Sequence, residues 1–214
     1  MFRPVKSAEF NAALRDSPAS ARFRDTYAKL MNFDAWIDQD AVVHVGDIRR
    51  SGSFSSAALC TLIIGDVEID GTIDLGPEGG HDEGGLFIVI GNVTCRNFIG
   101  HYGKCCLIDG DLVATDAIIN AFGDSGLWVV GSLRTKLFIG ADIWAEVGGR
   151  PFMDYGVGYC LPLGYDGEED MALYPAHDED ETAAVVVPEP SDDGYAWSAE
   201  DFAPLIRAGK PIFR

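Results

Sequence analysis

The chain has 214 residues, of which 47% are hydrophobic and 11% aromatic, a composition typical of a folded globular protein with one substantial core or two small ones. It contains 34 acidic residues against 16 lysines and arginines, so its formal net charge is −18. This charge argues against nucleic acid and anionic membranes as partners and favours a basic protein, although solubility alone also explains an acidic surface.

The N-terminal region begins MFRPVKSAEFNAALRDS and lacks the apolar segment of a secretory signal. Residues 7–38 are predicted to be helical, with helix starts near Ser7 and Ser17. The apolar side chains at helical spacing are Phe10, Leu14, Phe23, Tyr27 and Leu30. We interpret residues 1–40 as a helical cap over the open edge of the domain that follows; a partner surface is the alternative interpretation of the aromatic stripe.

A tripeptide of the form Gly-[Asp/Asn/Ser]-[Ile/Val/Leu] recurs through the middle of the chain. Its five copies begin at Gly46, Gly65, Gly91, Gly110 and Gly131. The copies are 19, 26, 19 and 21 residues apart, and their flanks also align. Apolar residues fall three positions before the glycine and two and eight positions after it, on two short alternating stretches. This alternation is typical of β-strands with one set of side chains facing inward.

The repeat predicts a mainly β protein, with a parallel β-solenoid of about five coils over residues 41–149. One coil alone cannot bury its apolar face, whereas stacked coils form continuous ladders of inward side chains. Glycine suits a corner where the backbone bends sharply or takes positive φ, and the Asp, Asn or Ser beside it hydrogen-bonds to the turn backbone. The corner carboxylates Asp47, Asp66 and Asp111 are explained by this turn chemistry.

The 26-residue spacing indicates an extra loop, Gly76 to Gly84, which leaves the second coil and is rich in turn residues. Loops on a rigid scaffold often bind partners, but a tolerated insertion is an equally good explanation. The partner-binding candidates in this loop are Glu78, His81, Asp82 and Glu83.

The string Gly123-Asp124-Ser125-Gly126 resembles the nucleophile segment of trypsin-like serine peptidases. It falls just before the alternating stretch 127–130, where a corner between coils is expected. A peptidase also needs a histidine base and a buried aspartate beside Ser125, and none of the four histidines lies in a resembling motif. We therefore interpret the string as a turn.

The coil IGDVEIDGTI, residues 64–73, is similar to a coil of the bactofilins, bacterial cytoskeletal proteins that polymerise and are built as parallel β-helices. IGNVTCRNFI and DGDLVATDAI follow it as comparable coils. The resemblance covers about half of the chain and specifies a fold better than a function. It implies a β-helical core and end-to-end assembly through exposed terminal coils.

This chain departs from the bactofilin pattern in its long flanks, its uneven coil lengths and its inserted loop. These departures favour an individual binding protein with capped ends, because caps prevent solenoids from polymerising. β-Solenoids also occur among the immunity proteins that neutralise bacterial polymorphic toxins, and the acidic charge is similar to what that role needs.

The region after residue 149 is predicted to be an acidic C-terminal extension, residues 150–214. Residues 151–206 contain 14 acidic residues and no lysine or arginine. The run Asp178, Glu179, Asp180 and Glu181 is interpreted as exposed chain: a solvated tail, or an arm that holds a basic partner. Further on, Ser198 with Asp201 three residues later predicts a short capped helix to Arg207 that docks on the solenoid, and residues 212–213 could add a strand.

Three classes of function remain open. A non-enzymatic binding protein, in its most concrete form a cytoplasmic immunity or antitoxin-like protein that occludes a basic toxin domain, is the leading hypothesis. A self-assembling structural solenoid similar to the bactofilins is the second. An enzyme on a β-helix scaffold is the third, but the chain lacks the hexapeptide period of solenoid acyltransferases.

The sequence predicts no catalytic residue, no metal site and no cofactor. The acids around Asp166 lack EF-hand spacing, and the five cysteines show no zinc-ligand pattern, so reduced thiols in a cytoplasmic protein are expected. No apolar run is long enough to span a membrane. We expect a monomer or dimer, with neither nucleic acid nor membrane as a partner.

Overall fold

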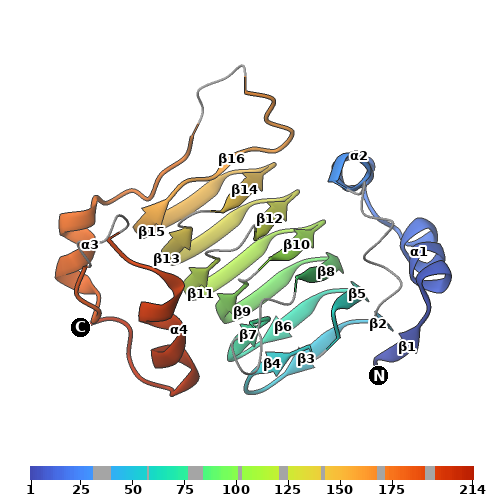
Figure 1. The fold of residues 1–214 in the computed structure, drawn as a ribbon, viewed down its shortest axis with the longest axis horizontal. Coiled ribbons are helices and arrows are strands. Elements are labelled where there is room, and N and C mark those ends of the chain that lie inside the picture. Colours follow the sequence, from blue (N-terminus) through green and yellow to red (C-terminus); the bar gives the residue numbers. More distant parts are fainter. Residues whose placement is uncertain are drawn as a thin grey trace.

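A computed structural model describes residues 1–30, 40–56, 58–76, 84–100, 103–120, 125–140, 143–167, 172–190 and 196–214. The fold is a parallel β-solenoid of about six turns, in which each turn gives one strand to each of two facing sheets (Figure 1). The predicted fold class is therefore confirmed, with about one turn more than the repeat indicated.

The first sheet, called sheet A, contains one strand from each coil in chain order and an additional strand at its N-terminal edge. Its strands are β1 (Arg3–Val5), β2 (Ala41–Val45), β5 (Cys60–Ile64), β8 (Gly85–Ile90), β10 (Lys104–Ile108), β12 (Gly126–Val129), β14 (Trp144–Val147) and β16 (Leu161–Pro162). All neighbours are parallel except β1, which pairs antiparallel with β2.

The second sheet, called sheet B, stacks in the same order along the solenoid. Its strands are β3 (Ile48–Arg50), β4 (Phe54–Ser55), β6 (Val67–Ile69), β7 (Thr72–Asp74), β9 (Val93–Ile99), β11 (Leu112–Ile119), β13 (Leu133–Gly140) and β15 (Pro151–Gly158). The short pairs β3/β4 and β6/β7 stand where later coils have one long strand. Strands β15 and β16 carry the ladders past residue 149, the boundary expected from composition.

The interior of the solenoid is a single apolar column between the two sheets. Its ladders include Ile63, Val89, Ile108, Val129 and Val147 from sheet A. From sheet B they include Val67, Val93, Leu112 and Leu133, then Ile73, Phe98, Ile118 and Phe138. Each such side chain contributes about 1.5–3 kcal/mol when fully buried, so this column is the main source of stability.

The corners between the sheets are a stack of the repeat glycines. A Cβ atom on Gly65 or Gly91 would lie 2.5 or 2.4 Å from the carbonyl oxygen of the corner glycine in the preceding coil. Both residues also have positive φ, 145° and 155°, so the corner excludes a side chain for two reasons. The prediction that glycine is required at the corner is confirmed.

The residue after each corner glycine bonds to the next coil and not, as expected, within its own turn. Oδ1 of Asp47 accepts the backbone N–H of Asp66, and Oδ1 of Asp66 accepts that of Asn92, at 3.0 and 2.8 Å. The ladder continues in the next two coils. Oδ1 of Asn92 accepts the backbone N–H of Asp111 at 2.9 Å, and Oδ1 of Asp111 accepts that of Ser132 at 2.7 Å. Each side chain replaces the ladder bond that the bent backbone cannot make.

The N-terminal segment is a helical cap, but it covers a different surface from the one expected. Helices α1 (Ser7–Asp16) and α2 (Ala21–Leu30) lie against the outer face of sheet A (Figure 1). Their buried residues Phe10, Leu14 and Phe23 pack on an outward-facing ladder. That ladder is Val43, Leu62, Ile88, Leu107 and Trp128. The first coil's edge in sheet A is instead covered by β1.

The C-terminal segment forms a second covering layer, on sheet B. Helices α3 (Glu179–Val185) and α4 (Ala199–Arg207) pack on a ladder near the C-terminal ends of the strands. This ladder is Ile99, Ile119, Ile139 and Val157. Helix α4 has the predicted capping box between Ser198 and Asp201 and docks on the solenoid as predicted. Phe213 forms only an isolated antiparallel bridge with Val186.

Candidate functional site

The acidic run at residues 178–181 is the start of helix α3, not the exposed chain we expected. Asp178 is the N-cap: its side chain accepts the N–H of Glu181 at 2.9 Å, while the Glu181 side chain accepts the N–H of Asp178 at 3.2 Å. Carboxylates at a helix N-terminus are favoured by the helix dipole. The acidity of this run therefore has a local structural cause.

Helix α3 is fixed rigidly to the last coils of the solenoid. The backbone N–H of Gly156 donates to the Thr182 hydroxyl at 3.1 Å, and Thr182 is fully buried. The His177 ring stacks on Tyr155 of β15 at 4.6 Å between centroids. Val186, directly after the helix, is also fully buried. The acidic first turn is consequently held in one place while its carboxylates face solvent.

Two of the four acids take no part in the capping box. Asp178 and Glu181 form the capping box, and Glu181 also lies 3.1 Å from Nδ1 of His177. Glu179 and Asp180 are exposed and form no ion pair with any residue in the described part of the chain. They are the residues of this run whose charge is free for a partner.

The other predicted binding residues, Glu78, His81, Asp82 and Glu83, lie outside the described residues. The base of their loop is described, and it is attached to the C-terminal layer. Arg207 of α4 donates to Asp74 from Nε and Nη2, at 2.6 and 3.0 Å. Asp74 Oδ1 also accepts the N–H of Gly76 at 3.1 Å. The loop base is thus bonded to Arg207 at the C-terminus of α4, while α3 contacts β15.

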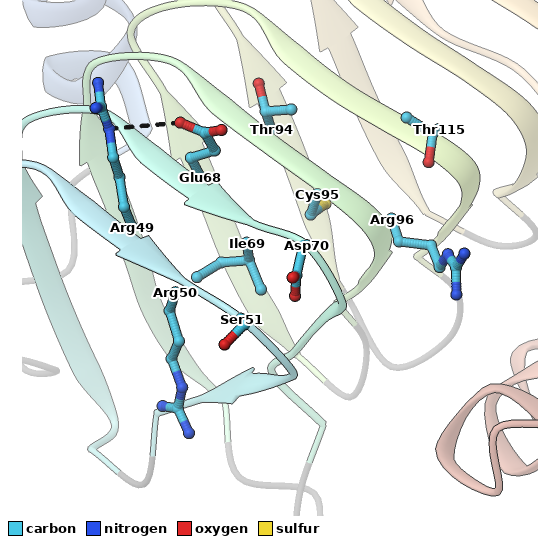
Figure 2. A pocket seen from close by; sticks show the side chains of 10 residues that line it. All are labelled: Arg49, Arg50, Ser51, Glu68, Ile69, Asp70, Thr94, Cys95, Arg96 and Thr115. Carbon is cyan, nitrogen blue, oxygen red and sulfur yellow. Dashed lines mark ion pairs between the residues drawn. The ribbon is translucent and has the colours of Figure 1, made fainter.

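A shallow hollow of about 580 Å³ lies on sheet B, where none of the helices in the described residues covers it. Figure 2 shows its lining, which comes from β3, β6 and β9, from Ser51 and Asp70 directly after β3 and β6, and from one residue of β11. Arg49 stands at one side of the hollow and Arg96 at the other, with Thr94 between them. Sequence reasoning missed this surface, although the alternation of Arg49 and Arg96 with core positions was a usable signal.

Two of the three arginines that line the hollow are paired with neighbouring carboxylates. Arg49 lies 3.4 Å from Glu68, and Arg96 lies 3.4 Å from Asp116. These side chains are between 41 and 76% exposed, so each pair contributes about 0–1 kcal/mol and exchanges readily with other ions. Asp70 is engaged differently, because it accepts the N–H of Gly52 at 2.5 Å.

A second hollow of about 520 Å³ shares Arg96 with the first and is closed on its other side by the C-terminal residues 209–213. Its floor contains a bulge, in which the N–H groups of Arg96 and Asn97 both donate to the carbonyl of Gly71. The Asn97 amide donates to Thr72 Oγ1 at 3.2 Å, and its own oxygen is buried without a hydrogen-bond partner.

The interpretation of Ser125 as part of a corner agrees with its surroundings. It directly precedes β12, is 1% exposed, and its hydroxyl accepts the N–H of Gly103 at 3.1 Å. Gly123, Asp124, His81 and His101 lie outside the described residues.

The five cysteines are free thiols, as expected. Burial raises the pKa of the Cys95 thiol to about 12 and that of Cys160 to about 12. Burial also raises the pKa of Cys60, Cys105 and Cys106. At neutral pH these thiols stay protonated, which opposes nucleophilic chemistry.

Metal ligands do not gather in the described part of the chain: no group of three or more His, Cys, Asp or Glu side chains there could hold an ion. The stacked corner residues Asp47, Asp66 and Asp111 are instead engaged with backbone N–H groups, as described above. In the same described residues, no helix is both long and apolar enough to cross a membrane.

No protein-family model, curated protein or solved structure gives a significant match to this chain.

Proposed function

We propose that this protein is a non-enzymatic binding protein of the cytoplasm whose acidic surface docks on a basic protein. Its most concrete form is an immunity-type protein that occludes a toxin domain. The observation that carries the proposal is the first turn of α3, where Glu179 and Asp180 are exposed and unpaired among the described residues, on a helix fixed to a rigid scaffold. Pre-positioned charges of this kind accelerate encounter with an oppositely charged partner.

The net charge of −18 supports the same partner chemistry. The Debye length is about 8 Å at physiological ionic strength, so the surplus acids steer a basic partner only near contact. The occlusion itself would then depend on close packing around the α3 turn. The base of the inserted loop is attached to α4 through the ion pair of Arg207 with Asp74.

The edge strands favour this proposal over the bactofilin-like alternative. Proline lacks the N–H that an added strand needs, and Pro4, Pro162 and Pro151 occur in the edge strands β1, β16 and β15. The remaining edge consists of β3 and β4, which are three and two residues long, and β3 contains Arg49 and Arg50. Short, charged or proline-containing edges are the usual protection against strand-to-strand assembly.

The first test is the solution mass, measured by light scattering over a range of concentrations. The proposal predicts a monomer or dimer, near 23 or 46 kDa given a chain mass of 23.1 kDa. Large species whose size grows with concentration would favour the assembly alternative.

The second test compares two pairs of charge reversals in affinity capture and in binding kinetics with the captured protein. We expect Glu179→Lys with Asp180→Lys to slow association with a basic partner about tenfold or more, while leaving the capping residues intact. The matched control is Asp16→Lys with Asp25→Lys, which makes the same charge change on α1 and α2. Equal binding by both variants would refute a role for α3.

A further inference from the structure

The outer face of sheet B has one part that the protein's own helices leave uncovered. Its side chains alternate with residues of the interior column, which places them outward. We call the row that pairs across the coils the outer row. It consists of Arg49, Glu68, Thr94, Val113, Arg134 and Phe152. The helices α3 and α4 cover a different ladder, nearer the ends of the same strands.

The outer row is unusual in charge for a protein with so few cations. Over β3, β6 and β9 the row consists of one cation, one acid and Thr94, and the cation Arg49 is paired with the acid Glu68. Over β13 and β15 the balance changes, because Arg134, Lys136 and Arg150 are accompanied by one nearby acid, Asp154. This end of the row is a local cationic patch on a molecule of net charge −18.

The patch is organised around one aromatic ring. The guanidinium carbons of Arg134 and Arg150 lie 4.4 and 5.0 Å from the ring centroid of Phe152. Neither arginine has a carboxylate within ion-pair distance in the described part of the chain. Stacking on the ring holds each guanidinium by its face and leaves its N–H donors at the edge available. Such donors match the geometry of a carboxylate.

We propose that the outer row is a docking surface for an extended acidic segment of a partner protein, anchored by Arg134 and Arg150 over Phe152. The spacing fits such a segment. Arg49 and Arg134, the two cations of the outer row, stand on β3 and β13, which are four strands apart. Strands lie about 4.8 Å apart, so these two cations are separated by about 19 Å along the row, the length of about six residues of extended chain.

Charge complementarity also selects the kind of ligand. The surplus of negative charge repels long polyanions such as nucleic acid and anionic membrane, which would reach beyond the row. A short acidic peptide contacts the row alone. The weak, exposed pairs of Arg49 with Glu68 and Arg96 with Asp116 let those arginines take a new carboxylate at little cost.

The test uses a fluorescein-labelled octamer of glutamate and the full-length protein at low salt, followed by fluorescence anisotropy. Both molecules are negatively charged, so general electrostatic attraction predicts no binding. We expect saturable binding that weakens at least tenfold in Arg134→Gln with Arg150→Gln. The matched control, Arg3→Gln with Arg15→Gln, removes the same charge from the N-terminal layer and should change binding less than twofold.

Three results would overturn the proposal. The first is no saturable binding of the octamer, and the second is equal weakening by both variant pairs. The third is tighter binding of inorganic polyphosphate of similar length than of the glutamate octamer. If light scattering instead shows a dimer that only the Arg134→Gln with Arg150→Gln variant abolishes, the occupant is a second copy of the chain and not another protein.

This inference is independent of the basic partner proposed above. The α3 charge reversals leave the outer row unchanged, and the arginine substitutions leave α3 unchanged. Loss of one binding activity without the other therefore identifies which proposal has failed.

Discussion

The outer faces of the two sheets differ although each repeating coil contributes a strand to both. On sheet A the outward ladder over coils one to five is apolar, and α1 and α2 cover it. On sheet B the outward residues form two zones: an apolar ladder under α3 and α4, and the polar outer row that stays exposed. The outward ladders under the helices are largely apolar, whereas the exposed outer row has polar side chains at four positions and apolar ones at Val113 and Phe152.

This difference shows how one repeat yields two different outer faces. In a parallel solenoid every strand is buried on its inner side. Only the residue types on its outer side therefore depend on whether another segment covers it. β8, with every residue buried, is apolar along nearly its whole length, whereas β9 in the same coil alternates Thr94 and Arg96 with buried neighbours. The outward residues of each strand thus indicate whether a helical layer covers it.

The substitution with the largest expected effect tests this difference between the two outer faces. One outward residue is replaced on each sheet of the same coil. Ile88→Ala removes a fully buried side chain beneath the N-terminal helices, and we expect the free energy of unfolding to fall by about 2–5 kcal/mol. Thr94→Ala, on the exposed outer row, should cost less than about 1 kcal/mol. Urea unfolding measures both. Similar losses for the two variants would mean that the outer faces are equally covered in solution.

A smaller effect is expected for the polar residue that interrupts the covered ladder of sheet A. Glu146 is 7% exposed. It accepts the indole N–H groups of Trp128 and Trp144, at 3.2 and 2.5 Å, and the backbone N–H of Gly164 at 2.6 Å. Its carboxylate satisfies three donors, of which the Trp128 indole belongs to a buried residue, 7% exposed, whereas Trp144 is 42% exposed.

Glu146→Ala should therefore cost about 1–3 kcal/mol of unfolding free energy, with a change in tryptophan fluorescence of the folded state. The control is Glu68→Ala on the outer row, whose ion pair with Arg49 is exposed and contributes about 0–1 kcal/mol. If Glu146→Ala is as mild as its control, water reaches these donors and the end of the covered ladder is open.

Much of the solenoid could be predicted because each corner requires a glycine. Stacked glycines have no room for a side chain, so they recur in the sequence and set the register of every ladder. The sixth corner was missed because Arg150, and not Asp, Asn or Ser, follows Gly149, although Gly149 continues the stack. Composition then suggested a boundary at residue 149, in the middle of a β ladder.

The covering layers were harder to predict because they form by contact between segments that are far apart in the sequence. The ladder containing Leu62, Ile88 and Leu107 is visible in the repeat, but alternation alone does not say which face each residue occupies. Helix α3 was missed for a different reason. A run of acids resembles a solvated linker by composition, and only the spacing of Asp178 and Glu181 indicated a capping box.

Only part of the candidate site could be predicted from the sequence, because the rest depends on contacts between separate segments. The acids of α3 were identified by charge density, but which of them are free depends on the cap and on His177. The patch of Arg134, Arg150 and Phe152 has no local signature, because its residues meet only when β13 pairs with β15.

The last test of the difference between the two outer faces requires no destabilising substitution. It measures whether the N-terminal layer opens separately from the solenoid. Cys60 and Cys105 lie on the outer face of sheet A beneath that layer, whereas Cys95, Cys106 and Cys160 lie in the interior column. Burial raises the pKa of all five thiols, so at pH 8 the native protein should react slowly with a thiol reagent.

In increasing urea, we expect Cys60 and Cys105 to react before the other three, because detaching two short helices requires less free energy than opening the column. Tandem mass spectrometry distinguishes the adjacent Cys105 and Cys106, and Cys105→Ser confirms the assignment. Simultaneous reaction of all five would show that the helices and the coils unfold as one unit. The apolar ladder of sheet A would then be part of a single continuous core, and the distinction between its inner and outer faces would describe geometry alone.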